Sequence, residues 1–130
     1  MYSPDVAVGL GSLIYALSKV DGQLHPEEIR VVRQLLAKSP YSDLAIGALF
    51  LRENVGETID EAYAFGLRRM TGKRAELDKR TKKQFVNILL RVAMAHKGIC
   101  REERAFIRRF WWDLQQGRAS SDTLIPLKPD

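Results

Sequence analysis

The strongest constraint on the fold of this chain is a segment that occurs twice. Residues 13–36 align without a gap with residues 88–111, which lie 75 positions further along. Few residues are identical in the two copies, but the apolar positions of the first copy meet apolar residues in the second. Each copy reads as helix, turn and helix, and self-similarity of this kind is typical of repeated helical units. We therefore expect two helix–turn–helix repeats, one near each end of the chain.

Each repeat contributes two helices, and the sequence between the repeats adds two more. We therefore predict an all-α bundle of about six helices. The length of 130 residues fits a single domain. Helix caps, glycine turns and apolar residues spaced three or four apart place the helices at about 5–20, 26–38, 44–53, 58–70, 78–95 and 101–116. We assign residues 1–116 to the helical domain and residues 117–130 to a loosely ordered C-terminal tail.

The composition indicates a cytoplasmic protein. No apolar run approaches the roughly 20 residues that a membrane-spanning helix needs. The first residues lack the basic segment of a signal peptide, with Asp5 where Lys or Arg is typical. The single cysteine, Cys100, excludes a disulfide within the chain and fits a reducing compartment.

Charge is distributed unevenly along the chain. Residues 1–65 carry five Lys/Arg against nine Asp/Glu, a balance of −4, whereas residues 66–130 carry sixteen against seven, a balance of +9. A basic half of this kind can contact an acidic protein, an anionic membrane surface or phosphate. Nucleic-acid binding is disfavoured for two reasons. The repeats lack the recognition-helix signature of the DNA-binding helix-turn-helix motif, and aromatic residues do not alternate with the basic ones. Solvated helix faces are the simpler interpretation of the same residues.

The segment that closes the first helix and opens the second reads LSKVDGQLHPEE, residues 17–28. It resembles the TerB-like family of tellurite-resistance-associated domains, and it is similar to the N-terminal regions of some membrane-anchored DnaJ-type co-chaperones. The resemblance covers about residues 5–116. It implies a compact helical bundle with pseudo-two-fold-related halves, a link to chemical-stress response, and metal binding through acidic residues near the two turns. It implies no defined catalytic activity.

Five carboxylates are candidates for that metal site: Asp21, Glu27, Glu28, Glu102 and Glu103. Hard cations such as Ca²⁺ are bound by several carboxylate oxygens, and the two glutamate pairs occupy equivalent places in the two copies. The same acids have a structural use, because carboxylates accept hydrogen bonds in turns and stabilise the positive N-terminus of a helix. Both interpretations stay open at the level of sequence.

The second copy departs from the family pattern, because His96 and Lys97 stand where the first copy has Asp-Gly. His96 and Cys100 are four residues apart, and His25 holds the place of Cys100 in the first copy. Such residues could bind a soft metal if the turns meet. A complete zinc signature is missing, however, and a lone cysteine is more often a small buried apolar residue.

The expected last helix carries a second kind of candidate site. Arg101, Arg104 and Arg108 recur every three or four residues along it. If Trp111 packs into the core, Trp112 must point away from it, and exposed tryptophan beside arginine is typical of protein interfaces. We predict that Arg101, Arg104, Arg108 and Trp112 contact a protein partner.

Taken together, these patterns favour a non-catalytic TerB-like module that binds a protein partner in a stress-response or membrane-associated assembly. Binding of a divalent cation by the acidic turns is the alternative, and binding of phosphate or nucleic acid by the basic half is the third possibility. An enzyme is disfavoured because the sequence contains no catalytic triad, phosphate loop or complete metal signature.

Overall fold

The computed structural model describes residues 2–72 and 75–116, and all regular structure in these ranges is helical. The helices are α1 Pro4–Lys19, α2 Pro26–Leu36, α3 Ser42–Val55, α4 Ile59–Thr71, α5 Lys79–Ala93 and α6 Arg101–Gln116. The prediction of an all-α bundle of about six helices is therefore confirmed for the described residues. The predicted tail, residues 117–130, lies outside them.

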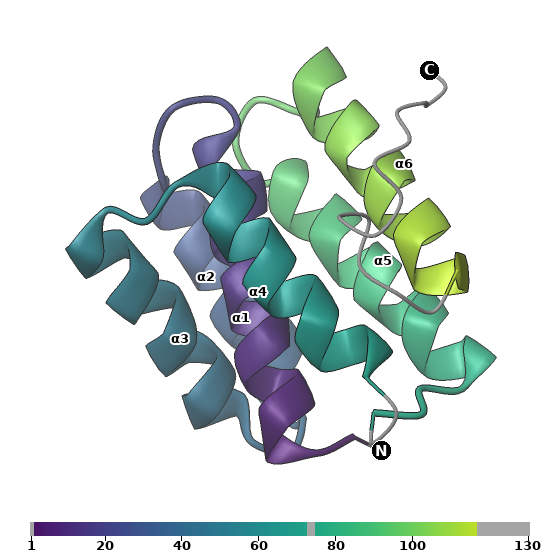
Figure 1. Ribbon diagram of the computed structural model, residues 1–130. Coiled ribbons are helices and arrows are strands. Elements are labelled where there is room, and N and C mark those ends of the chain that lie inside the picture. The colour runs from purple at the N-terminus through teal and green to yellow at the C-terminus, as the bar shows by residue number, and fades with distance from the viewer. Residues whose placement is uncertain (1, 73–74, 117–130) are drawn as a thin grey trace.

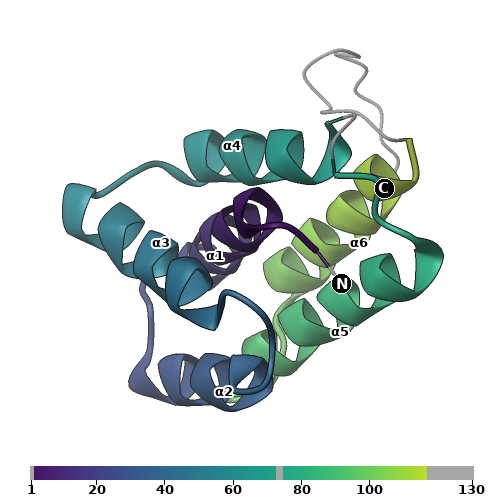
Figure 2. The same cartoon turned by 90° about the horizontal axis from the view of Figure 1, so that it is seen from below.

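Helix α1 lies at the centre of the bundle. In Figure 1 it runs between α3 on one side and α5 and α6 on the other, and Figure 2 shows α2, α3 and α4 around it. Every residue from Gly9 to Ser18 is buried. A helix that is apolar on all sides is stable only when other elements cover all of its faces, which is the position that α1 has here.

Glycines allow two neighbouring helices to approach α1 closely. A Cβ atom added to Gly11 would overlap the backbone carbonyl of Ala45 in α3. A Cβ atom on Gly66 of α4 would lie 2.6 Å from Leu13 Cγ and 2.7 Å from the carbonyl oxygen of Gly9. Any larger residue at Gly11 or Gly66 would push the helices apart.

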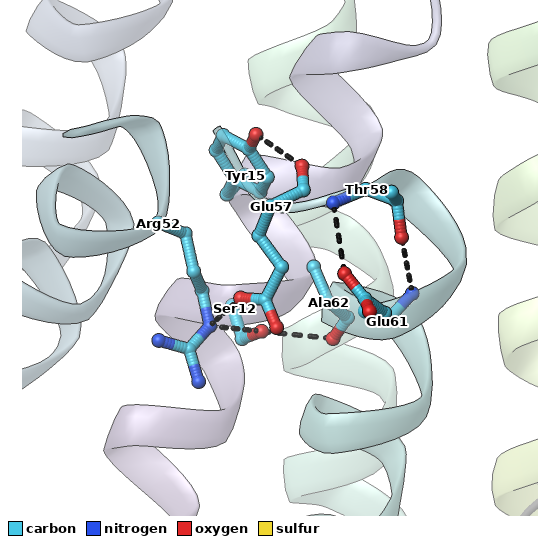
Figure 3. A network of polar contacts seen from close by, with 7 residues as sticks. All are labelled: Ser12, Tyr15, Arg52, Glu57, Thr58, Glu61 and Ala62. Atoms are coloured by element: carbon cyan, nitrogen blue, oxygen red, sulfur yellow. Dashed lines mark hydrogen bonds and ion pairs between the residues drawn. The ribbon is translucent and has the colours of Figure 1, made fainter. Parts of the chain in front are cut away.

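A polar network joins the end of α3 and the start of α4 to α1 (Figure 3). The hydroxyl of Ser12 donates to the carbonyl oxygen of Ala62 at 2.8 Å and accepts from Arg52 Nε at 2.8 Å. Arg52 Nε also lies 3.3 Å from a carboxylate oxygen of Glu57, and the Tyr15 hydroxyl donates to the Glu57 carbonyl at 2.6 Å. Because these polar groups have partners, the network fixes the α3–α4 turn without a large desolvation cost.

Most helix starts follow local sequence signals. Pro26 begins α2, where its missing N–H has no intrahelical partner to lose. Thr58 and Glu61 form the predicted capping box of α4: the Thr58 hydroxyl accepts from the Glu61 N–H at 3.1 Å, and the Glu61 carboxylate accepts from the Thr58 N–H at 3.3 Å.

Four predicted helix ends were wrong by about two residues. Helix α3 extends beyond the predicted 44–53 at both ends, and its start follows Tyr41 in the left-handed conformation. Helix α2 stops at Leu36 and α5 at Ala93. Just beyond each end an N–H group bonds to the third residue back: Ala37 to the Gln34 carbonyl at 3.4 Å, and Ala95 to the Val92 carbonyl at 3.1 Å. Such shorter-range bonds tighten the last turn of a helix and end it.

The described helices include none that is both long and apolar enough to cross a membrane. The pseudo-two-fold relation between the two halves stays a prediction.

Candidate metal centre

The turn that follows α1 and the turn that follows α5 meet at one end of the bundle, the upper end in Figure 1. Together they line a cavity of about 340 Å³. Its lining consists of Asp21, His25, His96, Lys97, Gly98, Ile99, Cys100 and Glu103. Because α5 packs against both α2 and α6, residues that are far apart in the sequence line the same cavity.

Both turns reverse the chain through left-handed backbone. Gly22 has a φ of 113° in the first turn, and Lys97 and Gly98 have φ values of 58° and 82° in the second. Glycine adopts such values without cost, whereas lysine does not. After each turn the chain enters a new helix, and the residues just before α2 and α6, His25 and Cys100, both line the cavity.

Glu28 and Glu103 are each the third residue of their helix, α2 and α6. Glu28 Oε1 accepts a hydrogen bond from the His25 N–H at 2.9 Å, and Glu103 Oε1 accepts one from the Cys100 N–H at 3.0 Å. Only 1% of Glu28 and 2% of Glu103 are exposed to solvent. Each bond uses one carboxylate oxygen of its glutamate.

Asp21 joins these two glutamates to form a cluster of three carboxylates, which we call the oxygen cluster. One oxygen from each residue lies within 4.8 Å of the others. Burial raises the pKa of Glu28 to about 7, and the charges of Asp21 and Glu103 act in the same direction. The hydrogen bond from the His25 backbone lowers the pKa of Glu28 but does not offset the burial.

A second group lies beside the oxygen cluster and contains His25, His96 and Glu27; we call it the imidazole cluster. One ligand atom from each residue lies within 4.8 Å of the others. The two imidazole rings are stacked, with centroids 3.6 Å apart and an angle of 17° between their planes. Glu27 Oε1 lies 3.5 Å from His96 Nδ1, and Asp21 Oδ2 lies 3.3 Å from His25 Nε2.

The five predicted metal ligands therefore divide into three groups. Asp21, Glu28 and Glu103 converge, Glu27 lies with the two histidines, and Glu102 is exposed and belongs to neither cluster. The resemblance implies a metal near these turns, and carboxylate oxygens such as these three are the kind of ligand that hard cations take.

Cys100 lines the cavity but belongs to neither cluster of the described residues. Burial raises the pKa of its thiol, which disfavours the thiolate that a metal requires. The groups that converge with His96 are His25 and Glu27, and not the Cys100 thiol that the spacing in the sequence had also made a candidate.

The predicted partner face lies on α6: it begins at Arg101, beside the cavity-lining Cys100, and continues along the helix to Trp112. Arg101, Arg104 and Arg108 are exposed, and 63% of Trp112 is accessible to solvent, while Trp111 is partly buried. The expected orientation of the two tryptophans is confirmed.

Sequence reasoning did not recognise that Glu28 and Glu103 are buried. The signal was present as spacing: each stands three residues after a residue at the N-cap position, as Glu61 does after Thr58. A carboxylate that reaches back to the N-cap N–H lies against the preceding turn. Here that turn is covered by its counterpart from the other copy.

The fold and the site together define a helical bundle with a carboxylate-lined and imidazole-lined cavity between two helix–turn–helix segments. The chain matches the family model described as tellurite resistance protein TerB over residues 7–121, and it belongs to that family. No curated protein and no solved structure gives a match. The similarity to DnaJ-type co-chaperones stays a prediction.

Proposed function

We propose that this chain is a non-catalytic TerB-like module that binds a divalent, oxygen-preferring cation at Asp21, Glu28 and Glu103. The observation that carries the proposal is the convergence of three carboxylates within 4.8 Å, two of which are almost completely buried. The resemblance to tellurite-resistance proteins supports a setting in chemical-stress response.

A bound cation would relieve an unfavourable arrangement of charge. Buried carboxylates that lie close together are unfavourable in their charged form, and the pKa of Glu28 is raised first by burial and then by the charges of Asp21 and Glu103. A divalent cation neutralises the cluster, and ions such as Ca²⁺ and Mn²⁺ take carboxylate oxygens together with water molecules. The capping bonds of Glu28 and Glu103 are compatible with this role, because each uses only one oxygen.

The proposal is tested by calorimetric titration of chelator-stripped protein with Ca²⁺ and Mn²⁺. We expect saturable binding that Glu28→Gln weakens by about tenfold or more, since the variant keeps the cap but loses a charged ligand. Glu102→Gln is the matched control, because it removes one charge from the same end of the bundle outside both clusters. Absence of binding below millimolar concentrations, or equal weakening by both variants, would contradict the proposal.

The α6 face supports a second function, the binding of a protein partner with an acidic surface. The observation that favours it is the large exposed fraction of Trp112, 63%, on the same helix as three exposed arginines. Tryptophan and arginine are enriched among the few interface residues that contribute most of the binding energy. We propose that this face serves the stress-response or membrane-associated assembly in which the module works.

Affinity purification with wild type and Trp112→Ala as baits tests the α6 face. A partner that is retained by wild type, lost with Trp112→Ala and retained by Met94→Ala would support it. Met94 is a suitable control because it is also exposed, at 59%, but lies outside α6. Equal recovery of every partner by the three baits would count against this second function.

A further inference from the structure

We propose that His25, His96 and Glu27 form a second cation site, which binds a borderline transition-metal ion of the Zn²⁺ class. This site goes beyond the proposed function, because it shares no ligand with the oxygen cluster and prefers a different class of ion. The two sites have separate ligands, and Asp21 of the oxygen cluster also contacts the His25 ring.

The geometry brings two nitrogen ligands and one oxygen ligand together. The rings of His25 and His96 come from different turns, yet their centroids lie only 3.6 Å apart. Glu27 contributes a carboxylate oxygen 3.5 Å from His96 Nδ1. All three ligand atoms fall within 4.8 Å of one another. Because imidazole lone pairs lie in the ring plane, the two rings must turn out of their stacked arrangement to direct both nitrogens at a single ion.

The two rings are also held in place before any ion binds. Only 14% of the His25 side chain and 24% of the His96 side chain are exposed. Asp21 contacts the His25 ring at 3.3 Å, and a carboxylate partner of this kind is what orients imidazoles in metal sites.

The ligand types select the ion. Two imidazoles and one carboxylate form a donor set that is typical of Zn²⁺, Co²⁺ and Ni²⁺, whereas Ca²⁺ and Mg²⁺ prefer oxygen alone. Three protein ligands leave a coordination position for water or for a donor from another molecule. The thiol of Cys100 is not part of this donor set, and the raised pKa keeps it protonated.

The site arises from the departure of the second copy from the first. His96 stands at the place that Asp21 holds in the first copy, and His25 stands at the place of Cys100. All four of these residues line the cavity, and the two histidine rings stack on each other there. The histidine at residue 96 therefore supplies a nitrogen ligand where the first copy has a carboxylate.

Titration of chelator-stripped protein with Co²⁺ tests this site, because the visible absorption of Co²⁺ reports on its ligands. We expect saturable binding of one ion per chain without the sulfur-to-cobalt band that a cysteine ligand would give, and displacement of Co²⁺ by Zn²⁺. His96→Asn and Glu27→Gln should each weaken Co²⁺ binding by about tenfold or more. Cys100→Ser and Glu102→Gln should leave it unchanged.

Two features of the design keep the result interpretable. Glu27 is largely exposed, with 48% of its side chain accessible, so Glu27→Gln changes the ligand without disturbing the core. Retention of Mn²⁺ or Ca²⁺ binding by His96→Asn would show that the two sites are separate, whereas Glu28→Gln tests the oxygen cluster alone.

The proposal would be overturned by any of three results. These are absence of saturable Co²⁺ binding below millimolar concentrations, equal Co²⁺ affinity in wild type, His96→Asn and Glu27→Gln, or loss of Co²⁺ binding in Cys100→Ser. In the first two cases the stacked rings are a packing contact only, and in the third the thiol is the ligand.

Discussion

Glu28 combines nearly complete burial with two neighbouring carboxylates. Burial, and then the negative charges of Asp21 and Glu103, raise its pKa to about 7. Close to neutral pH, a proton or a divalent cation therefore relieves the same unfavourable charge. Protons and cations compete for such a cluster, so the stability of the cation-free protein depends on pH.

The expected direction of this pH dependence follows from the shift of the pKa. The pKa of Glu28 is raised from 4.5 to about 7, so the folded state binds the proton more tightly than the unfolded state does. The resulting stabilisation is fully present below pH 4.5 and is lost as the pH rises through about 7. Glu28→Gln cannot ionise, and its side-chain oxygen can still accept from the His25 N–H.

We therefore expect Glu28→Gln to be more stable than cation-free wild type above pH 7, by up to about 3 kcal/mol, and closer to it in acid. Urea unfolding in the presence of chelator, measured across this pH range, checks the prediction. A difference between the two proteins that does not change with pH would contradict it.

Lys97 is the second residue with a specific prediction. Its φ of 58° costs about 1 kcal/mol in a residue with a side chain, and glycine removes this cost. Its positive charge also lines the cavity in which we place a cation. We expect Lys97→Gly to be more stable than Lys97→Ala, by up to about 1 kcal/mol in urea unfolding. Equal stability of the two variants would show that the turn carries no such strain.

At this scale the sequence identified the acidic residues but not their surroundings. Glu102 and Glu103 are adjacent and chemically identical, yet only Glu103 is buried. Neighbouring residues on a helix point about 100° apart, so the phase of α6 decides which one enters the cavity. The spacing of Glu103 from the N-cap contains that information, although its burial was not predicted from it. The stacking of His25 on His96 depends on tertiary packing and has no such signal in the sequence.

At the scale of helices, the close approach of α3 and α4 to α1 rests on positions without a side chain. The sequence indicated where the helices begin through proline, threonine and aspartate signals. It could not indicate that every residue from Gly9 to Ser18 is buried, because that depends on helices packed on all sides of α1. For the same reason, the network of Ser12 with Arg52 could not be predicted.

Two glycine substitutions separate helix propensity from helix packing. Gly11→Ala should destabilise the protein by about 2 kcal/mol or more, because the added Cβ atom meets the Ala45 carbonyl. Gly47 lies in α3 with no atom within 4 Å of an added Cβ, so Gly47→Ala should stabilise it by up to about 1 kcal/mol. Thermal unfolding of both variants checks this prediction. A stabilising Gly11→Ala would mean that α1 and α3 are not in close contact.

At the scale of the whole molecule, the candidate site joins segments from both ends of the chain. The repeat in the sequence predicted that two similar turns exist, and the structure places them around one cavity. A cation held by Asp21, Glu28 and Glu103 would therefore connect the first half of the bundle with α6. Binding should raise the stability of the whole domain rather than that of one turn.

The most direct measurement of the central claim is amide-resolved NMR of chelator-stripped protein with substoichiometric Mn²⁺, which broadens signals near the bound ion. We predict that amides around Asp21, Glu28 and Glu103 broaden together, that amides of α3 are unaffected, and that Glu28→Gln removes the effect. Broadening that is absent, or that instead centres on exposed carboxylates such as Asp60, would contradict a cation site between the two turns.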